Sequence, residues 1–101
     1  MALTSEKKKQ YRLIGHNLRP IVTIAGNGLS EGVIAEIDRA LNDHELIKIK
    51  LAIIDRDIRK QSVVNLCETT NAEVVQEIGK VALIFRAAKK PNPKKSNLAR
   101  V

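Results

Sequence analysis

The chain has 101 residues, enough for one modest domain, and no apolar run approaches the roughly 20 residues of a membrane span. Its single cysteine, Cys67, excludes an internal disulfide and a cysteine-rich zinc site. The net charge of +7 is concentrated at the ends, since residues 1–20 hold five basic and one acidic residue and residues 87–101 hold five basic and no acidic residues. This asymmetry favours a polyanionic partner, with nucleic acid first and a solubilising charge surplus as the alternative.

The first predicted element is a helix that Thr4 caps and that ends at about Gly15. Its polar face carries lysines that have no acidic residue four positions further on, so intrahelical ion pairs do not explain them. Its apolar stripe is Tyr11, Ile14 and Leu18, and its polar face is Ser5, Lys8, Lys9, Arg12 and His16. We predict that Lys7, Lys8, Lys9 and Arg12 contact the polyanion.

A strand over Ile21–Ile24 runs through Ala25-Gly26-Asn27-Gly28 into a helix that starts at Ser30 and ends at about Asp43. A strand, a flexible turn and a capped helix place several unpaired backbone N–H groups at one exposed point, a geometry that binds phosphate. The alternative is a tight connection in which the glycines only let the chain turn. We predict anion contacts at Arg19, which precedes the strand, and at Ala25, Gly26, Asn27 and Gly28. The helix that follows is acidic on its outer side, which makes that side a poor nucleic-acid surface.

The clearest strand is Leu46–Ile54, where apolar and polar residues alternate. One face holds Ile47, Ile49, Leu51 and Ile53, and the other, predicted to be solvent-exposed, holds Lys48, Lys50 and Ala52. We predict that Lys48 and Lys50 contact the polyanion. Asp55 or Asp57 then caps a third helix that ends at about Thr69.

Two short strands, Glu73–Ile78 and Val81–Arg86, flank Gly79-Lys80, a two-residue connection typical of a type II′ hairpin. Strict alternation puts Val74, Gln76 and Ile78 on a common face of the first strand. It likewise puts Val81, Leu83 and Phe85 on a common face of the second strand. It also puts Arg86 on an exposed face with Ala82 and Ile84. We predict that Arg86 contacts the polyanion there.

The elements therefore predict one compact α/β domain, residues 1–86, in the order α-β-α-β-α-β-β, with a four-stranded mixed sheet and helices chiefly on one face. Residues 87–101 read AAKKPNPKKSNLARV and have little to bury. They predict a basic flexible tail that stays mobile until it meets a partner, with Lys89 and Lys90 among its contacts.

Catalytic patterns are missing from the sequence. No H-x-x-x-H, C-x-x-C or G-x-x-x-x-G-K motif occurs, and a dinucleotide fingerprint fails because Glu31 stands where the third glycine belongs. We therefore expect no enzyme activity, no metal, no cofactor and no small-molecule substrate.

The segments RPIVTIAGNGLSEGVIAEIDRALNDHELIKIKL and VQEIGKVALIFR resemble the CRM (chloroplast RNA splicing and ribosome maturation) domain, and the resemblance covers most of the chain. It implies a fold similar to the C-terminal domain of translation initiation factor 3. It also implies RNA binding on precursors of the large (50S) ribosomal subunit. The family's KH-like G-x-x-G loop corresponds to Ala25-Gly26-Asn27-Gly28, where the last glycine matches and the first is alanine.

We therefore expect a non-catalytic, cytoplasmic, monomeric protein that binds ribosomal RNA and no membrane. Single-strand readers stack bases on aromatic rings, and Tyr11 and Phe85 are the only two rings in the chain. This scarcity indicates recognition of structured RNA through its shape and backbone. The alternative is a protein-interaction module whose acidic second helix docks a ribosomal protein or an assembly factor.

Overall fold

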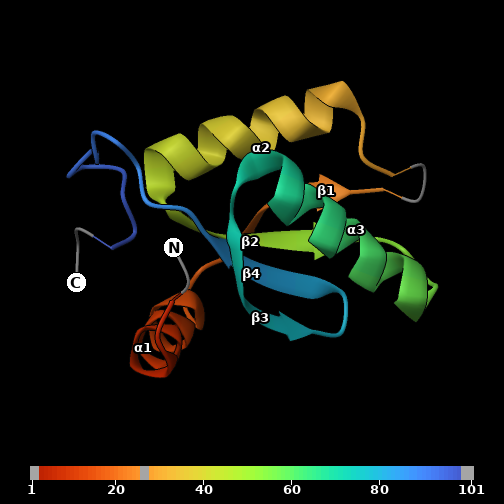
Figure 1. Cartoon of the computed structure of the whole chain (residues 1–101), viewed down its shortest axis with the longest axis horizontal. Helices are drawn as coiled ribbons and strands as arrows, with labels where there is room; N and C mark the ends of the chain where they lie inside the picture. The colour runs from red at the N-terminus through yellow and green to blue at the C-terminus, as the bar shows by residue number, and fades with distance from the viewer. Residues whose placement is uncertain (1–2, 26–27, 99–101) are drawn as a thin grey trace.

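Three helices and four strands occur in the predicted order in the computed structural model, which describes residues 3–25 and 28–98 (Figure 1). They are α1 (Ser5–Gly15), β1 (Pro20–Ile24), α2 (Glu31–His44), β2 (Leu46–Leu51), α3 (Arg56–Thr70), β3 (Glu73–Ile78) and β4 (Val81–Phe85). The predicted caps are confirmed, because the side chains of Thr4, Ser30 and Asp55 each accept a backbone N–H of the helix that follows.

The sheet has the strand order β1-β2-β4-β3, in which β1 and β2 are parallel and β4 runs antiparallel to both of its neighbours. Because β1 and β2 end at the same side of the sheet, α2 and α3 both begin there. We call this side the carboxyl edge; it also holds the Gly79-Lys80 turn (Figure 1). The opposite side, where α2, α3 and β4 end, is the amino edge.

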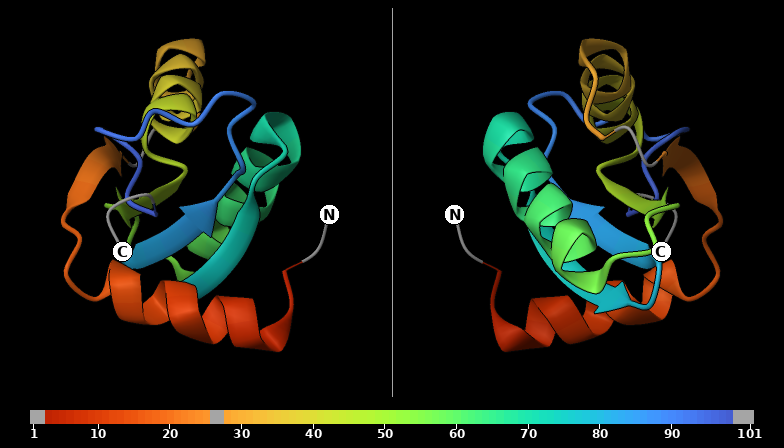
Figure 2. Two further views of the ribbon diagram at one scale, coloured as in Figure 1. Left: turned by 90° about the vertical axis from the view of Figure 1, so that its left-hand side faces the viewer. Right: turned by 90° about the vertical axis from the view of Figure 1, so that its right-hand side faces the viewer.

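Helices lie on both faces of the sheet: α2 and α3 cover one face, and α1 crosses the other (Figures 1 and 2). The larger core lies under α2 and α3 and includes Ile24, Ile37 and Leu66, all fully buried. A smaller core under α1 contains Tyr11, Leu46, Val75 and Leu83. Two of the three helices thus share a face, as predicted, and the third protects part of the other face.

The position of α1 corrects the prediction for β2. The face of Lys48 and Lys50 is not uniformly exposed: Leu46 on that face is fully buried under α1, Lys48 is half-buried, and only Lys50 is exposed. The strand also ends at Leu51 rather than Ile54. The part of this face that α1 leaves uncovered, toward the carboxyl edge, is called the open sheet face below.

A bulge in β3 corrects the predicted alternation. The register with β4 shifts between Val74, which pairs with Ile84, and Gln76, which pairs with Leu83. The extra residue places Val75 in the core under α1 and separates Val74 from the face of Gln76. The prediction that Ala82 and Ile84 face solvent is also wrong, because both are fully buried in the larger core.

The described part of the tail is attached to the amino edge through Glu45. Its carboxylate accepts the backbone N–H of Ala88 (2.9 Å) and the hydroxyl of Ser96 (2.7 Å), which is fully buried. Asn97 adds a bond from its side-chain amide to the carbonyl of Leu46 (2.6 Å). The expectation that this segment has little to bury is therefore wrong at Ser96, while the division of the chain at residue 86 stays a prediction.

Two glycines give a test of how closely α1 packs. A Cβ added to Gly15 would lie 2.4 and 2.8 Å from the methyl carbons of buried Leu83, whereas a Cβ at Gly32 would meet nothing closer than the Ser30 hydroxyl at 3.9 Å. We expect Gly15→Ala to lower the free energy of unfolding by about 1–3 kcal/mol, because it overpacks this contact. Gly32→Ala should raise it by about 0.5–1 kcal/mol, since only helix propensity changes.

Urea denaturation followed by circular dichroism measures both variants. An unchanged or higher stability of Gly15→Ala would show that α1 does not press against Leu83 as the structure places it.

Candidate nucleic-acid interface

The turn before α2 has a backbone conformation that favours glycine at position 28. Gly28 has φ +88°, and its N–H donates to the carbonyl of Ala25 at 3.0 Å, which closes the turn. A Cβ at Gly28 would meet nothing within 4 Å, so the space beside its backbone is open. Ser30 then caps α2 through a 3.2 Å bond from the N–H of Val33. The predicted contacts Gly26 and Asn27 lie outside the described residues.

Three of the four basic side chains predicted as contacts on α1 share its outer side. Lys9 and Arg12 are exposed and Lys8 is half-buried, and no ion pair within the described ranges engages them. Lys7 lies on a different side of the helix, with its ammonium 6.0 Å from the centre of the Tyr11 ring. The four predicted contacts of α1 therefore do not form one patch: Lys8, Lys9 and Arg12 share the outer side, and Lys7 is turned toward the N-terminal part of β3.

Polar side chains from three elements meet on the open sheet face. His16 at the end of α1, Lys48 of β2 and Gln76 of β3 line a hollow of about 330 Å³, whose floor is apolar. Lys48 also lines a second hollow of about 160 Å³ together with Arg19. Lys50, exposed and two residues further along β2, extends this set toward the carboxyl edge. Lys48 and Lys50 thus share the open sheet face, with Lys50 nearer the Gly28 turn, whereas Arg19 precedes β1 at the amino edge, beside His44 and Asn97.

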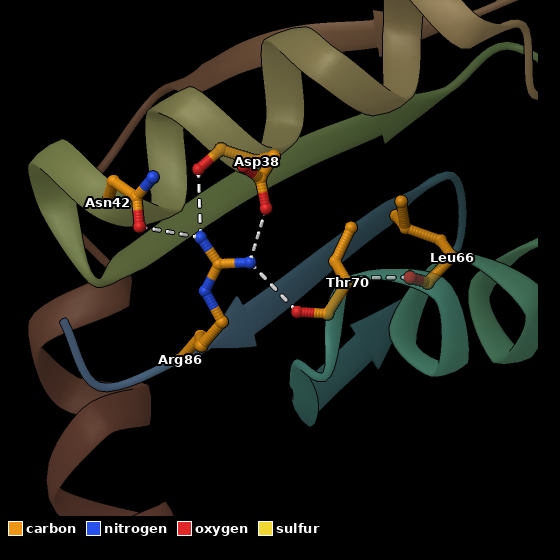
Figure 3. A network of polar contacts seen from close by, with 5 residues as sticks. All are labelled: Asp38, Asn42, Leu66, Thr70 and Arg86. Atoms are coloured by element: carbon orange, nitrogen blue, oxygen red, sulfur yellow. Dashed lines mark hydrogen bonds and ion pairs between the residues drawn. The ribbon is translucent and has the colours of Figure 1, made fainter. Parts of the chain in front are cut away.

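Arg86 is occupied inside the domain (Figure 3). Its Nη1 donates to the carboxylate of Asp38 at 2.6 Å and to the carbonyl of Thr70 at 2.8 Å. Its Nη2 donates to the Asp38 carbonyl and to the Asn42 side-chain oxygen, both at 2.9 Å. This side chain therefore joins the end of β4 to α2 and to the end of α3, and its predicted exposed position is wrong.

Lys89 and Lys90 stand apart from the other predicted contacts. Both are exposed, and with Arg86 they line a hollow of about 680 Å³ at the amino edge. That edge lies across the sheet from the Gly28 turn (Figure 1). Their role as RNA contacts stays a prediction, and they would form a second region of contact.

The structure adds a cationic cluster that the sequence reading did not identify. Arg56, Arg59 and Lys60 of α3 line a hollow of about 340 Å³ at the carboxyl edge. The signal was available, since arginine and lysine at positions i, i+3 and i+4 share one side of a helix. It was missed because the segment Asp55–Asp57 was interpreted only as a helix start.

The described residues hold no arrangement that suggests catalysis. Burial, together with the nearby Glu77 carboxylate, raises the pKa of the Cys67 thiol to about 11, so this cysteine is a poor nucleophile at neutral pH. No group of three or more potential metal ligands comes together in residues 3–25 and 28–98. None of the helices described is long and apolar enough to cross a membrane.

Known proteins with similar sequences share this domain. The sequence profile of the CRS1 / YhbY (CRM) domain matches residues 3–86. The "Probable RNA-binding protein PA4753" of Pseudomonas aeruginosa is 54% identical over 100 residues, covering 99% of this chain and 96% of that protein. The "RNA-binding protein" of Haemophilus influenzae is 44% identical over 87 residues, covering 85% of this chain and 88% of that protein.

A solved structure has the same fold. The solution structure of the hypothetical protein SAV1595 from Staphylococcus aureus matches with a TM-score of 0.78 and 36% sequence identity. The match covers 88% of this chain and 93% of that one. The predicted arrangement of three helices and a four-stranded mixed sheet is therefore confirmed by an independent structure.

The structural role of Arg86 can be tested with a variant that keeps its charge. Lysine cannot reproduce the forked bonds to Asp38, Asn42 and Thr70, so we expect Arg86→Lys to lower the free energy of unfolding by about 2 kcal/mol. RNA affinity of the folded variant should stay within about twofold of the wild type, because the net charge is unchanged. Lys89→Gln is the control: it should leave stability unchanged. Full stability in Arg86→Lys would contradict the assigned role.

Proposed function

Because the chain belongs to the CRS1 / YhbY (CRM) domain family, we propose that it is a non-catalytic RNA-binding protein that acts on ribosomal RNA during assembly of the large (50S) ribosomal subunit. Relatives that cover almost the whole chain are named RNA-binding proteins, which supports RNA as the partner. The ribosomal target rests on the resemblance to the CRM domain described above.

One observation carries the proposal: Lys48 and Lys50 of the open sheet face lead to a glycine turn with open space beside its backbone. These two lysines supply charge to phosphates, Arg19 adds charge at the start of β1, and Gly28 lets a phosphate approach the start of α2. Within the described ranges none of these three cations is held in an ion pair. Their charges are therefore available to a ligand.

The two aromatic rings support recognition of structured RNA. Tyr11 and Phe85 pack against each other, with ring centres 5.0 Å apart, and Tyr11 is only 9% exposed. Rings that build the small core under α1 are not free to stack on bases. Affinity is then expected to come from phosphates and from the shape of the RNA.

The acidic outer side of α2 is less suited to docking a protein partner than the sequence suggested. Asp38 is held by Arg86, and the carboxylate of Asp43 lies 3.9 Å from the ammonium of Lys95. The outer side of α2 carries four acidic residues, Glu31, Glu36, Asp38 and Asp43, and the last two thus make contacts within the chain. We therefore favour RNA binding over the protein-interaction alternative.

The experiment that tests the proposal is a salt titration with a transcript of the large-subunit ribosomal RNA precursor. If about six phosphates are neutralised, log K should fall with log salt concentration at a slope of about 4–5. An unstructured homopolymer of equal length is the control and should bind more weakly. No binding to the transcript, or a slope near zero, would contradict the proposal. Gel filtration of the protein at the same salt concentrations would test the monomeric state. Sedimentation of cell extract would test association with cytoplasmic precursors of the subunit.

The Gly28 turn provides a matched pair of variants. Asparagine and aspartate have the same shape, and both tolerate positive φ better than other residues, so both variants should fold. Only aspartate adds a negative charge, which costs about 1–4 kcal/mol when it lies near 4 Å from a phosphate. We expect Gly28→Asp to lower RNA affinity about tenfold or more. This loss should be at least as large as that of the double variant Lys8→Gln/Arg12→Gln.

Gly28→Asn separates charge from backbone geometry. A small loss in this variant assigns the effect of aspartate to charge, and a large loss assigns it to the backbone of the turn. If folded Gly28→Asp, checked by circular dichroism, binds RNA like the wild type, the glycines only let the chain turn.

A further inference from the structure

We propose that the hollow lined by Arg56, Arg59 and Lys60 at the start of α3 is a second phosphate-binding site for the same RNA. This inference rests on the proposed function and extends the interface from the open sheet face around the carboxyl edge. We call the hollow the α3 site. It is lined by Leu51, Arg56, Arg59, Lys60, Glu77 and Gly79 and has a volume of about 340 Å³.

The charges of the α3 site favour an anion. Three cationic side chains face one carboxylate, that of Glu77, and within residues 3–25 and 28–98 no ion pair joins Glu77 to any of them. Asp55 and Asp57 flank the hollow without lining it, and one carboxylate oxygen of Asp55 accepts the N–H groups of Asp57 and Ile58 at 2.9 and 3.0 Å. The lining of the hollow itself therefore carries more positive than negative charge.

Arg59 is held in position before any ligand arrives. Its Nη1 donates to the carbonyls of Ile53 and Ile54 at 2.7 and 2.8 Å, which fixes the guanidinium over the end of β2. Within the described residues both side-chain hydrogen bonds of Arg59 use Nη1, so the other nitrogens of the guanidinium remain for an acceptor in the hollow. A guanidinium fixed in this way loses little side-chain entropy when it binds a phosphate.

Arg56 is not explained by the stability of its own helix. It is the first residue of α3, where the helix dipole favours acidic rather than basic side chains. Its side chain is exposed, and no side-chain hydrogen bond or ion pair of the described residues involves it. Lys60, one turn further on, is exposed in the same way. Two cations that contribute nothing evident to the fold are the expected signature of a surface that binds an external anion.

The α3 site lies close enough to the Gly28 turn for one RNA to reach both. Leu51, which lines the site, pairs with Ile24, the last residue of β1 before the turn. The hollow is lined by Leu51 at the end of β2 and by Glu77 and Gly79 at the end of β3, and β4 lies between these two strands. Neighbouring strands lie about 4.8 Å apart, so the end of β1, from which the Gly28 turn follows, is roughly 5–15 Å from the strands that line the hollow. A few consecutive nucleotides span this distance.

The experiment compares Arg56→Gln with Arg39→Gln, which removes one exposed arginine from α2 away from the α3 site. Both variants lose one charge, so any long-range effect on RNA association is matched. We expect Arg56→Gln to lower affinity for the ribosomal RNA transcript about three- to tenfold and to reduce the salt slope by about 0.7–0.9, the value for one lost phosphate contact. Arg39→Gln should change neither quantity appreciably. Lys60→Gln should act like Arg56→Gln.

Equal affinity and equal slope in Arg56→Gln and Arg39→Gln, with a wild type that binds RNA, would overturn the α3 site and leave the proposed function standing. A wild type that does not bind RNA would remove both. Two further arms use inorganic phosphate and polyglutamate. If either ligand binds the wild type and not Arg56→Gln while RNA binding is unchanged, the α3 site serves a small anion or an acidic protein, and the inference is wrong.

Discussion

The parallel pairing of β1 with β2 decides where the functional segments of this domain lie. Ile24 and Leu51, the last residues of the two strands, are partners in the ladder, so the chain leaves both strands at one edge of the sheet. The helices that follow must begin at that edge and end at the other. The Gly28 turn, the first turn of α2 and the cations at the start of α3 are thereby gathered at the carboxyl edge, although about 30 residues of sequence separate them.

At the opposite edge, contacts within the chain hold the tail, and Glu45 is their centre. It ends α2 with φ +62° and ψ −50°, a backbone conformation that a non-glycine residue adopts only at a cost of about 1–3 kcal/mol. All of its polar groups are satisfied: its N–H bonds to Leu41, its carbonyl to the N–H of Arg86, and its carboxylate to Ala88 and Ser96. Many bonds thus hold one strained residue. Glu45 in this way ties the described part of the tail to the amino edge, so this segment does not cover the carboxyl edge, which stays open to a ligand.

Local signals made most of the fold predictable, and long-range packing made the remainder unpredictable. The helix starts could be predicted from Thr4, Ser30 and Asp55, because a capping side chain bonds to a backbone N–H within three residues of itself. The burial of Leu46 depends on where α1 packs, which no local pattern encodes. Arg86 reads as exposed because its partner Asp38 is 48 residues away. The spacing of Arg56, Arg59 and Lys60 could have been noticed in the sequence, but the hollow that they line could not, since α3, β2 and the β3–β4 turn build it together.

The distribution of charge restricts how an RNA can lie on the domain. Glu31 and Glu36 are exposed on the outer side of α2 and repel phosphates that approach from that side. The open sheet face and the α3 site lie on either side of the carboxyl edge and attract them. An RNA backbone that contacts both the open sheet face and the α3 site would pass the Gly28 turn between them. With both aromatic rings used in the core, selectivity would come from RNAs whose phosphates match the spacing of these sites, which is a property of folded RNA rather than of base sequence.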